Sequence, residues 1–406
     1  MRSNGEPKIV KRSVLIIVEN SSVPFDPRVW REASSLFEHG YKVTVLCPRD
    51  SQYSRGYDFI DGVHIYRHPM PGDGNNLWGY LLEYTCALFW EFLYSWWIFF
   101  RHGFQVIQGC NPPDTIFLVA MPFKLLGVKY IFDHHDANPE LYASKYGNQG
   151  IMFKCQVWLE RLTYRFSEVV MTTNGSYRDL AITRGKIDPA DVFIVRNGPN
   201  PDTVKPVEPN VALKCGKRYL VGYLGTMSIQ EGLDILINVA GYLRGLGRSD
   251  IQFICIGGGP ALNGLRKMVQ EKGLEDTVNF TGRIPYAELL EILSTADVCV
   301  NPDKPCEMND ISTMHKIMEY MALSKPIVQF DLKEGRFSAQ EASLYADNQD
   351  QVRDFAEKIL WLLDHPEERK RMGEIGRKRV ETKLAWKYSV DNLLAAYEGA
   401  FSKRTE

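Results

Sequence analysis

The chain has 406 residues, 45% of them hydrophobic and 24% charged, with a formal net charge of −2. The length predicts two or three domains, and the composition is typical of a globular protein rather than a disordered one. The balanced charge gives no basic field of the kind that attracts nucleic acid, so no nucleic-acid partner is expected. The eight cysteines form no CxxC pair, which favours reduced thiols and a cytoplasmic location over a disulfide framework.

The first half of the chain alternates short apolar strands with helices. Strands are predicted at SVLIIV, KVTVLC, GFQVIQG, KYIFDHH, EVVMTTN and VFIVRNG, and helices at RVWREASSLFEHG and TIFLVAMPFKLLG. The apolar run VLIIV is too short for a signal peptide and is better explained as the first strand. Strands joined by helical crossovers predict a parallel, doubly wound, Rossmann-like sheet.

Residues 77–100, LWGYLLEYTCALFWEFLYSWWIFF, form a long aromatic segment whose charged residues are Glu83 and Glu91. Its length is sufficient for a membrane span, but ionised carboxylates in the middle of a span are costly. Every fourth residue from Gly79 to Ser95 is small or polar, so a helix here has one narrow stripe of that kind. Two interpretations stay open: a helix inside a domain core, and an interfacial helix that contacts a membrane or a lipid-linked substrate.

A proline-rich region at 197–213 predicts a linker, after which the alternation of strands and helices restarts. We therefore expect an α/β fold with two Rossmann-like domains, at 1–205 and 206–383. A C-terminal helix at 384–406 is expected to pack back toward the first domain. Two such domains facing across a cleft would bind ligands at the carboxyl ends of the strands in both.

The segment GGGPAL follows a predicted strand but has Leu262 where a dinucleotide fingerprint has its third glycine, and no GxxxxGK[ST] loop is present. A tight turn explains these glycines better than phosphate binding, so a nicotinamide dehydrogenase has little support. A helix predicted near NDISTMHKIMEYMA is more informative. Its free N–H groups suit a diphosphate, Lys316 adds positive charge, and Glu319 suits a ribose diol; a surface ion pair between the two is the plain alternative.

The stretch FDHHDANPE at 132–140 raises three alternatives: a metal site, a proton-transfer site and an ordinary loop at the end of a strand. Adjacent side chains diverge in an extended chain and rarely share one ion. Because no HxxxH, HExxH or DxD pattern is present either, no metal is expected. The same alternation predicts that His134 and His135 point to opposite sides.

Several segments, in this order, resemble the family 4 glycosyltransferases, retaining enzymes of the two-domain GT-B fold. They are ENSSVPFDPRVWREASSLFEHGYKVTVLCP, NPPD and HDANPELY in the first half, and YLGTMSIQEGLDILI, FICIGGGP, VNFTGRIPYAELLEILSTADVCVNP and STMHKIMEYMALSKPIV in the second. The resemblance implies metal-independent and cofactor-independent transfer of a sugar from a nucleotide-diphosphate sugar. The acceptor, a saccharide or a lipid-linked one as used in glycan or exopolysaccharide assembly, would be held by the first domain. Segment 77–100 would then give peripheral contact with the cytoplasmic face of a membrane.

The resemblance also assigns residues. His135 would face the donor sugar, Glu319 would bind the ribose, and Lys316 would contact the phosphates. The residues expected to bind the donor are Asn197, Gly225, Thr226, Met227, Arg283, Asp310, Ser312, Thr313 and Met314. The residues expected in the acceptor and phosphate loops are Ser22, Asp26, Arg28, Asn111 and Asp136, the last of which would fix its loop or the imidazole of His135.

Three positions depart from the family pattern. Ile311 stands where many relatives carry a first glutamate, for which Asp310 would substitute. Thr226 and Glu231 stand where relatives carry cations that hold the phosphates, and Lys316 is the expected replacement. Two alternatives stay open: a nucleotide-sugar epimerase or hydrolase on the same fold, and a non-catalytic scaffold of a glycan-assembly complex.

Overall fold

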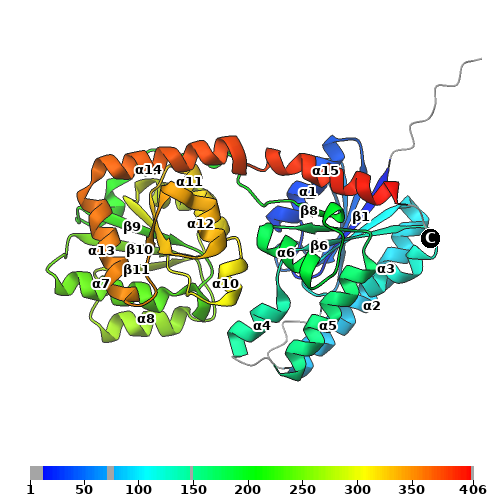
Figure 1. Ribbon diagram of the computed structural model, residues 1–406, viewed down its shortest axis with the longest axis horizontal. Helices are drawn as coiled ribbons and strands as arrows, with labels where there is room; N and C mark the ends of the chain where they lie inside the picture. Colours follow the sequence, from blue (N-terminus) through cyan, green and yellow to red (C-terminus); the bar gives the residue numbers. More distant parts are fainter. Residues whose placement is uncertain (1–11, 71–76, 147–149, 404–406) are drawn as a thin grey trace, which may run out of the picture. The chain divides into compact units, whose positions relative to one another are not determined.

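The computed structural model describes residues 12–70, 77–146 and 150–403 (Figure 1). The chain forms two compact units, Met1–Val195 with Val390–Glu406, and Arg196–Ser389. The first junction comes earlier than the expected boundary at 205 because the proline-rich segment after Val195 is bound to the second unit. Arg377 donates hydrogen bonds to the carbonyls of Val204 (2.8 Å) and Pro201 (2.9 Å).

The first unit is built on an eight-stranded sheet in the order β3-β4-β2-β1-β5-β6-β7-β8. Every pairing is parallel except that of the edge strand β3 with β4. The strands are β1 (Ser13–Val18), β2 (Lys42–Pro48), β3 (Tyr57–Ile60), β4 (Val63–His68), β5 (Val106–Cys110), β6 (Lys129–His134), β7 (Val169–Thr172) and β8 (Val192–Ile194). The central strands β1, β5, β6 and β7 are buried on both faces, which explains their continuous apolar runs.

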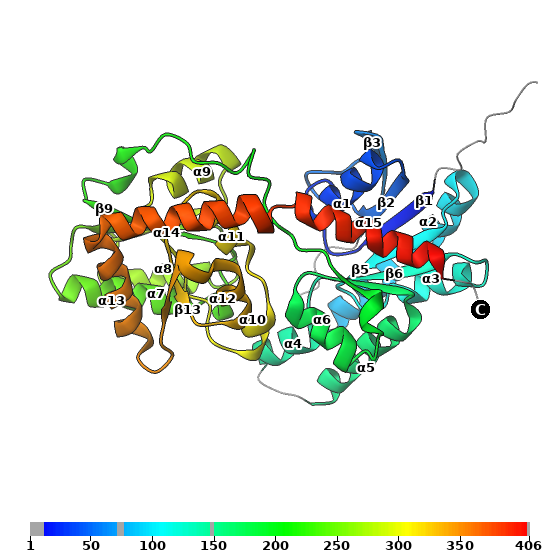
Figure 2. The same ribbon diagram turned by 45° about the horizontal axis from the view of Figure 1, so that its top comes forward.

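Helices cover both faces of this sheet (Figure 1, Figure 2). One face carries α1 (Pro27–Glu38) and α15 (Lys387–Ser402); the Tyr397 hydroxyl of α15 donates to the Gln108 side chain of β5 at 2.5 Å. The opposite face packs on α2 (Leu77–His102), α3 (Phe117–Lys124) and α5 (Ile151–Phe166). The remaining helices of the unit are α4 (Asn138–Tyr146) and α6 (Gly175–Thr183).

The second unit has a six-stranded, all-parallel sheet in the order β11-β10-β9-β12-β13-β14. Its strands are β9 (Tyr219–Leu224), β10 (Ile251–Ile256), β11 (Val278–Gly282), β12 (Val298–Asn301), β13 (Ile327–Phe330) and β14 (Ser343–Ala346). Its helices are α7 (Leu233–Gly245), α8 (Leu262–Glu271), α9 (Tyr286–Thr295), α10 (Glu307–Ile311), α11 (His315–Ala322), α12 (Lys333–Ala339), α13 (Gln351–Asp364) and α14 (Pro366–Arg379). Two apolar clusters, one on each face of the sheet, form its core.

The helix α2 presents its small and polar stripe to the protein interior. Ala87, Glu91 and Ser95 are fully buried, whereas five of the described aromatic side chains of this helix are exposed: Tyr84, Phe89, Phe92, Trp97 and Phe100. The carboxyl groups of Glu91 and of Glu19, at the end of β1, are buried and have no hydrogen-bond partner among the described residues. Burial raises the pKa of Glu91 to about 8, and burial together with the charges of Glu91 and Glu83 raises the pKa of Glu19 to about 10.

The burial of Glu91 makes the stability of the first unit depend on pH. Because its pKa in the folded state lies above its unfolded value, stability is lost as the pH rises from about 4.5 to about 8. We expect Glu91→Gln to stabilise the protein by roughly 2–4 kcal/mol at pH 8.5 and by less than about 1 kcal/mol at pH 5. Urea unfolding at both pH values measures this, and an equal gain at the two pH values would contradict it.

Candidate active site

In the first unit, the candidate site is centred on His135, the first residue after β6. Its imidazole Nε2 lies 2.6 Å from the Oδ2 atom of Asp133, and its side chain keeps 13% exposure. The two residues lie on the same side of the extended chain because they are two apart. Burial lowers the pKa of His135, but the Asp133 carboxylate more than offsets this, so the pKa is raised and the protonated form is favoured.

A buried network holds Asp133 in place. Arg28 of α1 donates to its Oδ1 atom at 2.6 Å, and Gln108 of β5 donates to its Oδ2 atom at 3.0 Å. Burial alone would raise the pKa of Asp133, but the charges of Arg28 and His135 hold it far below its usual range. Glu32 lies 3.1 Å from Arg28, and burial still raises its pKa to about 8. Asp133 therefore carries the negative charge that fixes the imidazole.

The predicted acceptor and phosphate loop residues have mainly structural contacts. Arg28, expected to contact phosphate or acceptor, pairs with Asp133 and Glu32 and donates to the Val195 carbonyl at 2.7 Å. Asp26 is the N-cap of α1 and accepts from two backbone N–H groups at 3.0 Å. Ser22 is buried in the preceding turn, where its carbonyl accepts from the Asp26 backbone at 2.9 Å.

Asn111 and Asp136 shape the loop that follows β6. The Asn111 side chain accepts from the backbone N–H of His135 at 2.6 Å and donates to the Asp136 carbonyl at 2.7 Å. It also donates to Asp114 at 2.9 Å. The imidazole of His135 is thus fixed by Asp133, while the backbone of Asp136 belongs to the loop.

His134 points away from His135, into the core. It is fully buried, and its ring stacks on Phe132 and Tyr177, with ring centroids 5.4 and 4.8 Å apart. Its Nδ1 lies 2.9 Å from the Tyr164 hydroxyl. Burial, with a contribution from Arg184, lowers the pKa of His134 to about 3, so it is neutral at pH 7.

In the second unit, the loops after β9 and β10 interlock through their glycines. A Cβ atom on Gly257 would lie 2.0 Å from the Gly225 carbonyl oxygen, and one on Gly259 would lie 2.4 Å from that of Met227. The Met227 backbone N–H donates to the Gly258 carbonyl at 3.0 Å. The glycines therefore allow two loops to approach closely. Met227 is buried, and Thr226 is exposed beside it.

The expected helix near NDISTMHKIMEYMA is two helices, α10 and α11, with residues 312–314 between them. Met314, which lacks a capping side chain, is the N-cap of α11, so none of the predicted capping residues caps it. Ser312 donates to the Met308 carbonyl at 2.7 Å, and Asp310 accepts from the Lys333 backbone at 2.8 Å.

Two other predicted donor residues, Thr313 and Asn197, lie near the start of α11. The Thr313 hydroxyl accepts from Arg196 at 3.4 Å and lies 3.5 Å from Glu334. Asn197 is buried and lies 3.3 Å from the imidazole Nε2 of His315. Asn197, Asp310, Ser312, Thr313 and Met314 are therefore close to one another around the α10–α11 loop.

Lys316 is the centre of an ion-pair network rather than an uncompensated cation. Its ammonium lies 2.6 Å from Glu231 and 2.9 Å from Asp303, and 4.8 Å from the centre of the Tyr223 ring. Glu231 occupies the position where relatives carry a lysine. Its carboxylate therefore neutralises Lys316, the residue expected to take over the role of that missing lysine. A direct contact of Lys316 with a phosphate would have to compete with two carboxylates.

We expect Lys316→Met to destabilise the second unit by about 3–5 kcal/mol, because Asp303 and Glu231 would be left without their cation. The melting temperature should fall by roughly 10 °C for a unit of this size. Lys304→Met is the matched control, since its pair with Asp234 (2.8 Å) is more exposed and is expected to contribute less than about 1 kcal/mol. Calorimetry measures both, and equal melting temperatures for the two variants would contradict this role.

Glu319 and Arg283 complete the predicted donor residues. Glu319 lies on α11, one turn after Lys316, and is partly exposed. Arg283 follows β11, is exposed, and makes no hydrogen bond or ion pair with the described residues. The predicted donor residues therefore lie after β9, after β11 and around α11.

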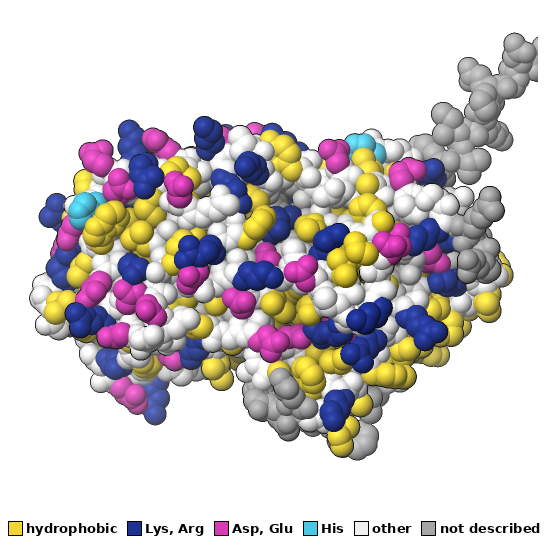
Figure 3. Space-filling model, in the orientation of Figure 1, with side chains coloured by type: hydrophobic (Ala, Val, Ile, Leu, Met, Phe, Trp, Pro, Cys, Tyr) yellow, Lys and Arg dark blue, Asp and Glu magenta, His cyan; other side chains and the backbone are white. Residues whose placement is uncertain are grey.

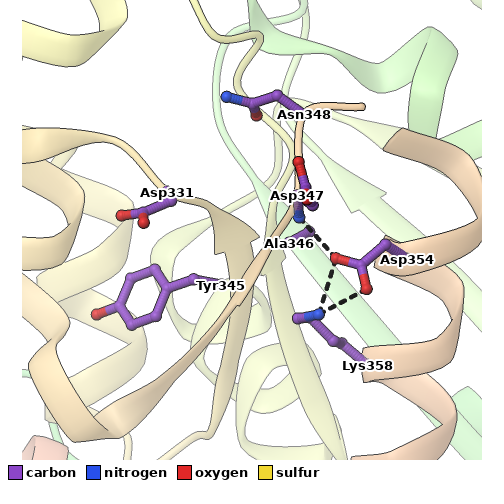
Figure 4. Close-up of a pocket in the computed structure, with 7 residues that line it drawn as sticks. All are labelled: Asp331, Tyr345, Ala346, Asp347, Asn348, Asp354 and Lys358. Carbon is purple, nitrogen blue, oxygen red and sulfur yellow. Dashed lines mark hydrogen bonds and ion pairs between the residues drawn. The ribbon is translucent and has the colours of Figure 1, made fainter. Parts of the chain in front are cut away.

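A hollow of about 570 Å³ also lies at the carboxyl ends of β13 and β14 (Figure 4). It is lined by Asp331, Tyr345, Ala346, Asp347, Asn348, Asp354 and Lys358. Asp331 is paired with Arg336 at 2.5 Å, and Asp354 with Lys358 at 2.7 Å, so much of its charge is compensated. None of the predicted donor residues lines it.

The sequence prediction missed the partners of the site residues: Glu32, Gln108, Asp133, Arg196 and Asp303. Asp133 could have been found, because alternation along β6 places residues 133 and 135 on one side. Glu32 could have been found as well, because it follows Arg28 by four residues on α1, a spacing that brings two helical side chains together. Gln108, Arg196 and Asp303 come from other elements, for which the sequence pattern gives no signal.

Two family models match the chain. "Glycosyl transferase 4-like domain" matches residues 26–198, and "Glycosyl transferases group 1" matches residues 204–379. Alpha-D-kanosaminyltransferase of Streptomyces kanamyceticus is 27% identical over 181 residues, which cover 44% of this chain and 45% of that protein. The alignment thus spans about half the length of that relative.

Solved structures share the fold at low sequence identity. Sucrose-phosphate synthase of Thermosynechococcus elongatus has a TM-score of 0.73 at 16% identity, covering 97% of this chain and 100% of that one. Anabaena HepE in complex with UDP-glucose has a TM-score of 0.72 at 12% identity, covering 95% and 99%. The predicted α/β fold with two Rossmann-like units is confirmed. The chain belongs to the glycosyltransferases that these two family models describe, and its fold is GT-B.

Proposed function

We propose that this protein transfers a sugar from a nucleoside-diphosphate sugar to a saccharide or lipid-linked acceptor, with retention of anomeric configuration and without a metal ion. The observation that carries the proposal is the His135 imidazole, held by a buried, ionised Asp133 at the carboxyl end of β6. Ligands of doubly wound sheets bind at this end of the strands. The relative HepE, solved with UDP-glucose, supports a nucleotide sugar as donor.

His135 would orient the donor sugar. Because Asp133 favours the imidazolium and Arg28 and Gln108 fix Asp133, the ring needs no rearrangement to donate a hydrogen bond to the sugar. Such preorganised donors contribute most when charge develops during the reaction. Glu319 would bind the ribose diol, and Arg283 would lie against the base.

The leaving diphosphate would be stabilised by the backbone N–H groups at the start of α11. Lys316 would hold the start of α11 in place through its ion pairs with Glu231 and Asp303. As the resemblance implies, the bond from the anomeric carbon to the phosphate oxygen breaks while the acceptor oxygen attacks from the same face. The acceptor proton passes to the leaving phosphate, so His135 need not act as a base.

The charges around His135 favour a reaction without a metal at this place. Possible ligand atoms of Glu32, Cys110, Asp133 and His135 lie within 4.8 Å of one another. However, the Arg28 guanidinium already neutralises this group, at 2.6 Å from Asp133 and 3.1 Å from Glu32. Burial and the nearby carboxylates raise the pKa of the Cys110 thiol, which leaves it protonated.

A lipid-linked acceptor on the cytoplasmic face of a membrane is supported by α2, on which several aromatic side chains, among them Phe89, Phe92 and Phe100, are exposed. None of the described helices combines the length and hydropathy that crossing a membrane requires. The proposed association is therefore peripheral.

Binding and consumption of a panel of nucleotide sugars test this function. We expect one donor to bind with release of its nucleoside diphosphate that depends on an acceptor. Equal consumption without acceptor would indicate an epimerase or hydrolase instead. Failure to bind any donor would favour a scaffold, which the compensated Lys316 and the missing cations at Thr226 and Glu231 also support.

A further inference from the structure

The helices α2, α3 and α5 form one contiguous layer on the first unit's sheet (Figure 1). Trp96 and Phe99 of α2 pack on Phe123 of α3, with ring centroids 4.5 and 5.4 Å apart. Phe117 of α3 packs in turn on Phe166 of α5, at 5.7 Å. The exposed faces of the three helices are therefore neighbours, and we call them the α2–α3–α5 face.

This face exposes large apolar side chains from all three helices. The most exposed are Phe100 (80%) on α2, Leu125 (88%) just after α3, and Ile151 (83%) and Trp158 (60%) on α5. Phe92 on α2 and Leu118 on α3 are also exposed. Isolated exposed apolar residues are ordinary, but a patch that crosses three packed helices is characteristic of an interaction surface.

The orientation of α2 indicates what kind of medium this face meets. A helix that faces water normally buries its apolar side and exposes its polar side. In α2 the order is reversed, because Glu91 and Ser95 are buried and Phe92 and Phe100 are exposed. An apolar medium outside the helix accounts for this reversal.

The exposed charges on this face are mainly basic. Basic side chains accompany the apolar ones on every helix: Arg101 on α2, Lys124 on α3, and Lys154, Arg161 and Arg165 on α5. Glu91 of α2 and Glu160 of α5 are buried, whereas Glu83, in the first half of α2, is partly exposed. Lys124 is paired with Glu168 at 2.9 Å, so the uncompensated positive charge lies mainly on α5. Figure 3 shows hydrophobic and basic side chains side by side over α5.

We infer that the α2–α3–α5 face docks this protein onto an anionic lipid bilayer. Its aromatic and aliphatic side chains would enter the boundary between headgroups and acyl chains, while the basic side chains contact anionic headgroups. A second copy of the chain fits less well, because a two-fold axis would bring the same cations together. The inference extends the membrane contact of the proposed function from one helix to three and specifies the lipid charge.

Vesicle flotation without donor or acceptor tests the inference independently of sugar transfer. We expect the protein to bind vesicles of phosphatidylcholine with 30% phosphatidylglycerol far better than phosphatidylcholine alone. Lys154→Glu/Arg161→Glu/Arg165→Glu should lower the partition coefficient by about 100-fold, since each cation near an anionic surface contributes roughly fivefold. The matched control, Arg266→Glu/Lys267→Glu/Lys272→Glu on and just after α8, has the same charge change and should bind within about threefold of the wild type.

A second pair of variants tests the apolar part. Phe92→Ser/Phe100→Ser should weaken binding at least about tenfold, whereas Val211→Ser/Trp361→Ser, on exposed sites of the second unit, should not. Equal losses in the test and control variants, or no loss in either test variant, would overturn the inference. So would a wild-type dimer that dissociates on Phe92→Ser/Phe100→Ser in sedimentation velocity. Failure of donor binding by the wild type would contradict the proposed function alone.

Discussion

Replacing His135 with alanine should lower kcat/KM for sugar transfer by about 100-fold or more while the protein stays folded. The imidazole is held 2.6 Å from Asp133 and is the partly exposed member of the network. Its loss would remove an oriented donor of hydrogen bonds to the sugar. Asp133 would keep its Arg28 partner, so the melting temperature should change by only a few degrees.

His134→Ala is the matched control, one residue away, and should have the opposite effect. It would leave a cavity among Phe132, Tyr164 and Tyr177 and remove the partner of the Tyr164 hydroxyl. We expect a loss of about 2–4 kcal/mol in the free energy of unfolding, with kcat of the folded protein within a few-fold of the wild type. Normal transfer by His135→Ala would exclude the proposed role, and assays on both variants at equal folded concentration measure it.

Glu319→Gln should weaken binding of the nucleoside diphosphate by about 10- to 100-fold, because hydrogen bonds from a diol to a carboxylate contribute roughly 1.5–3 kcal/mol. Glu319 lies on the partly exposed side of α11, one turn beyond Lys316. The KM for the donor should rise accordingly, while the acceptor KM stays unchanged.

Glu288→Gln on α9 provides the control for a change of charge in the same unit, since Glu288 is exposed and away from α11 in sequence. Titration calorimetry with the nucleoside diphosphate measures both variants. An affinity of Glu319→Gln equal to that of Glu288→Gln would place the ribose elsewhere.

The repeated strands and helices predicted most of the fold, because buried parallel strands are continuous apolar runs. The hairpin of β3 and β4 was missed, although Asp61 and Gly62 between them both have positive φ, at 46° and 86°. An Asp-Gly pair between apolar residues is a strong hairpin signal. The break between α10 and α11 gave no such signal. Residues 309–314 contain neither glycine nor proline, and several of them are good capping types, so no single residue marked the position of the break.

The residues of the candidate site could be predicted in outline, but the pairing of their charged side chains could not. The sequence indicated opposite directions for His134 and His135, which the structure confirms, because alternation is a local property. The carboxylates around Lys316 and the Asp133 partner of Arg28 come from other segments of the chain, so the sequence did not reveal the ion pairs that these cations form. The stripe on α2 was visible, but its burial depends on packing against the sheet.

The most direct test of sugar transfer with retention and without metal is NMR of the product formed from an α-linked nucleotide sugar in the presence of EDTA. We expect a new glycoside with the small anomeric coupling of an α-linkage, formed at the same rate with EDTA as with added Mg²⁺. A β-linked product, or transfer that stops on chelation, would contradict it.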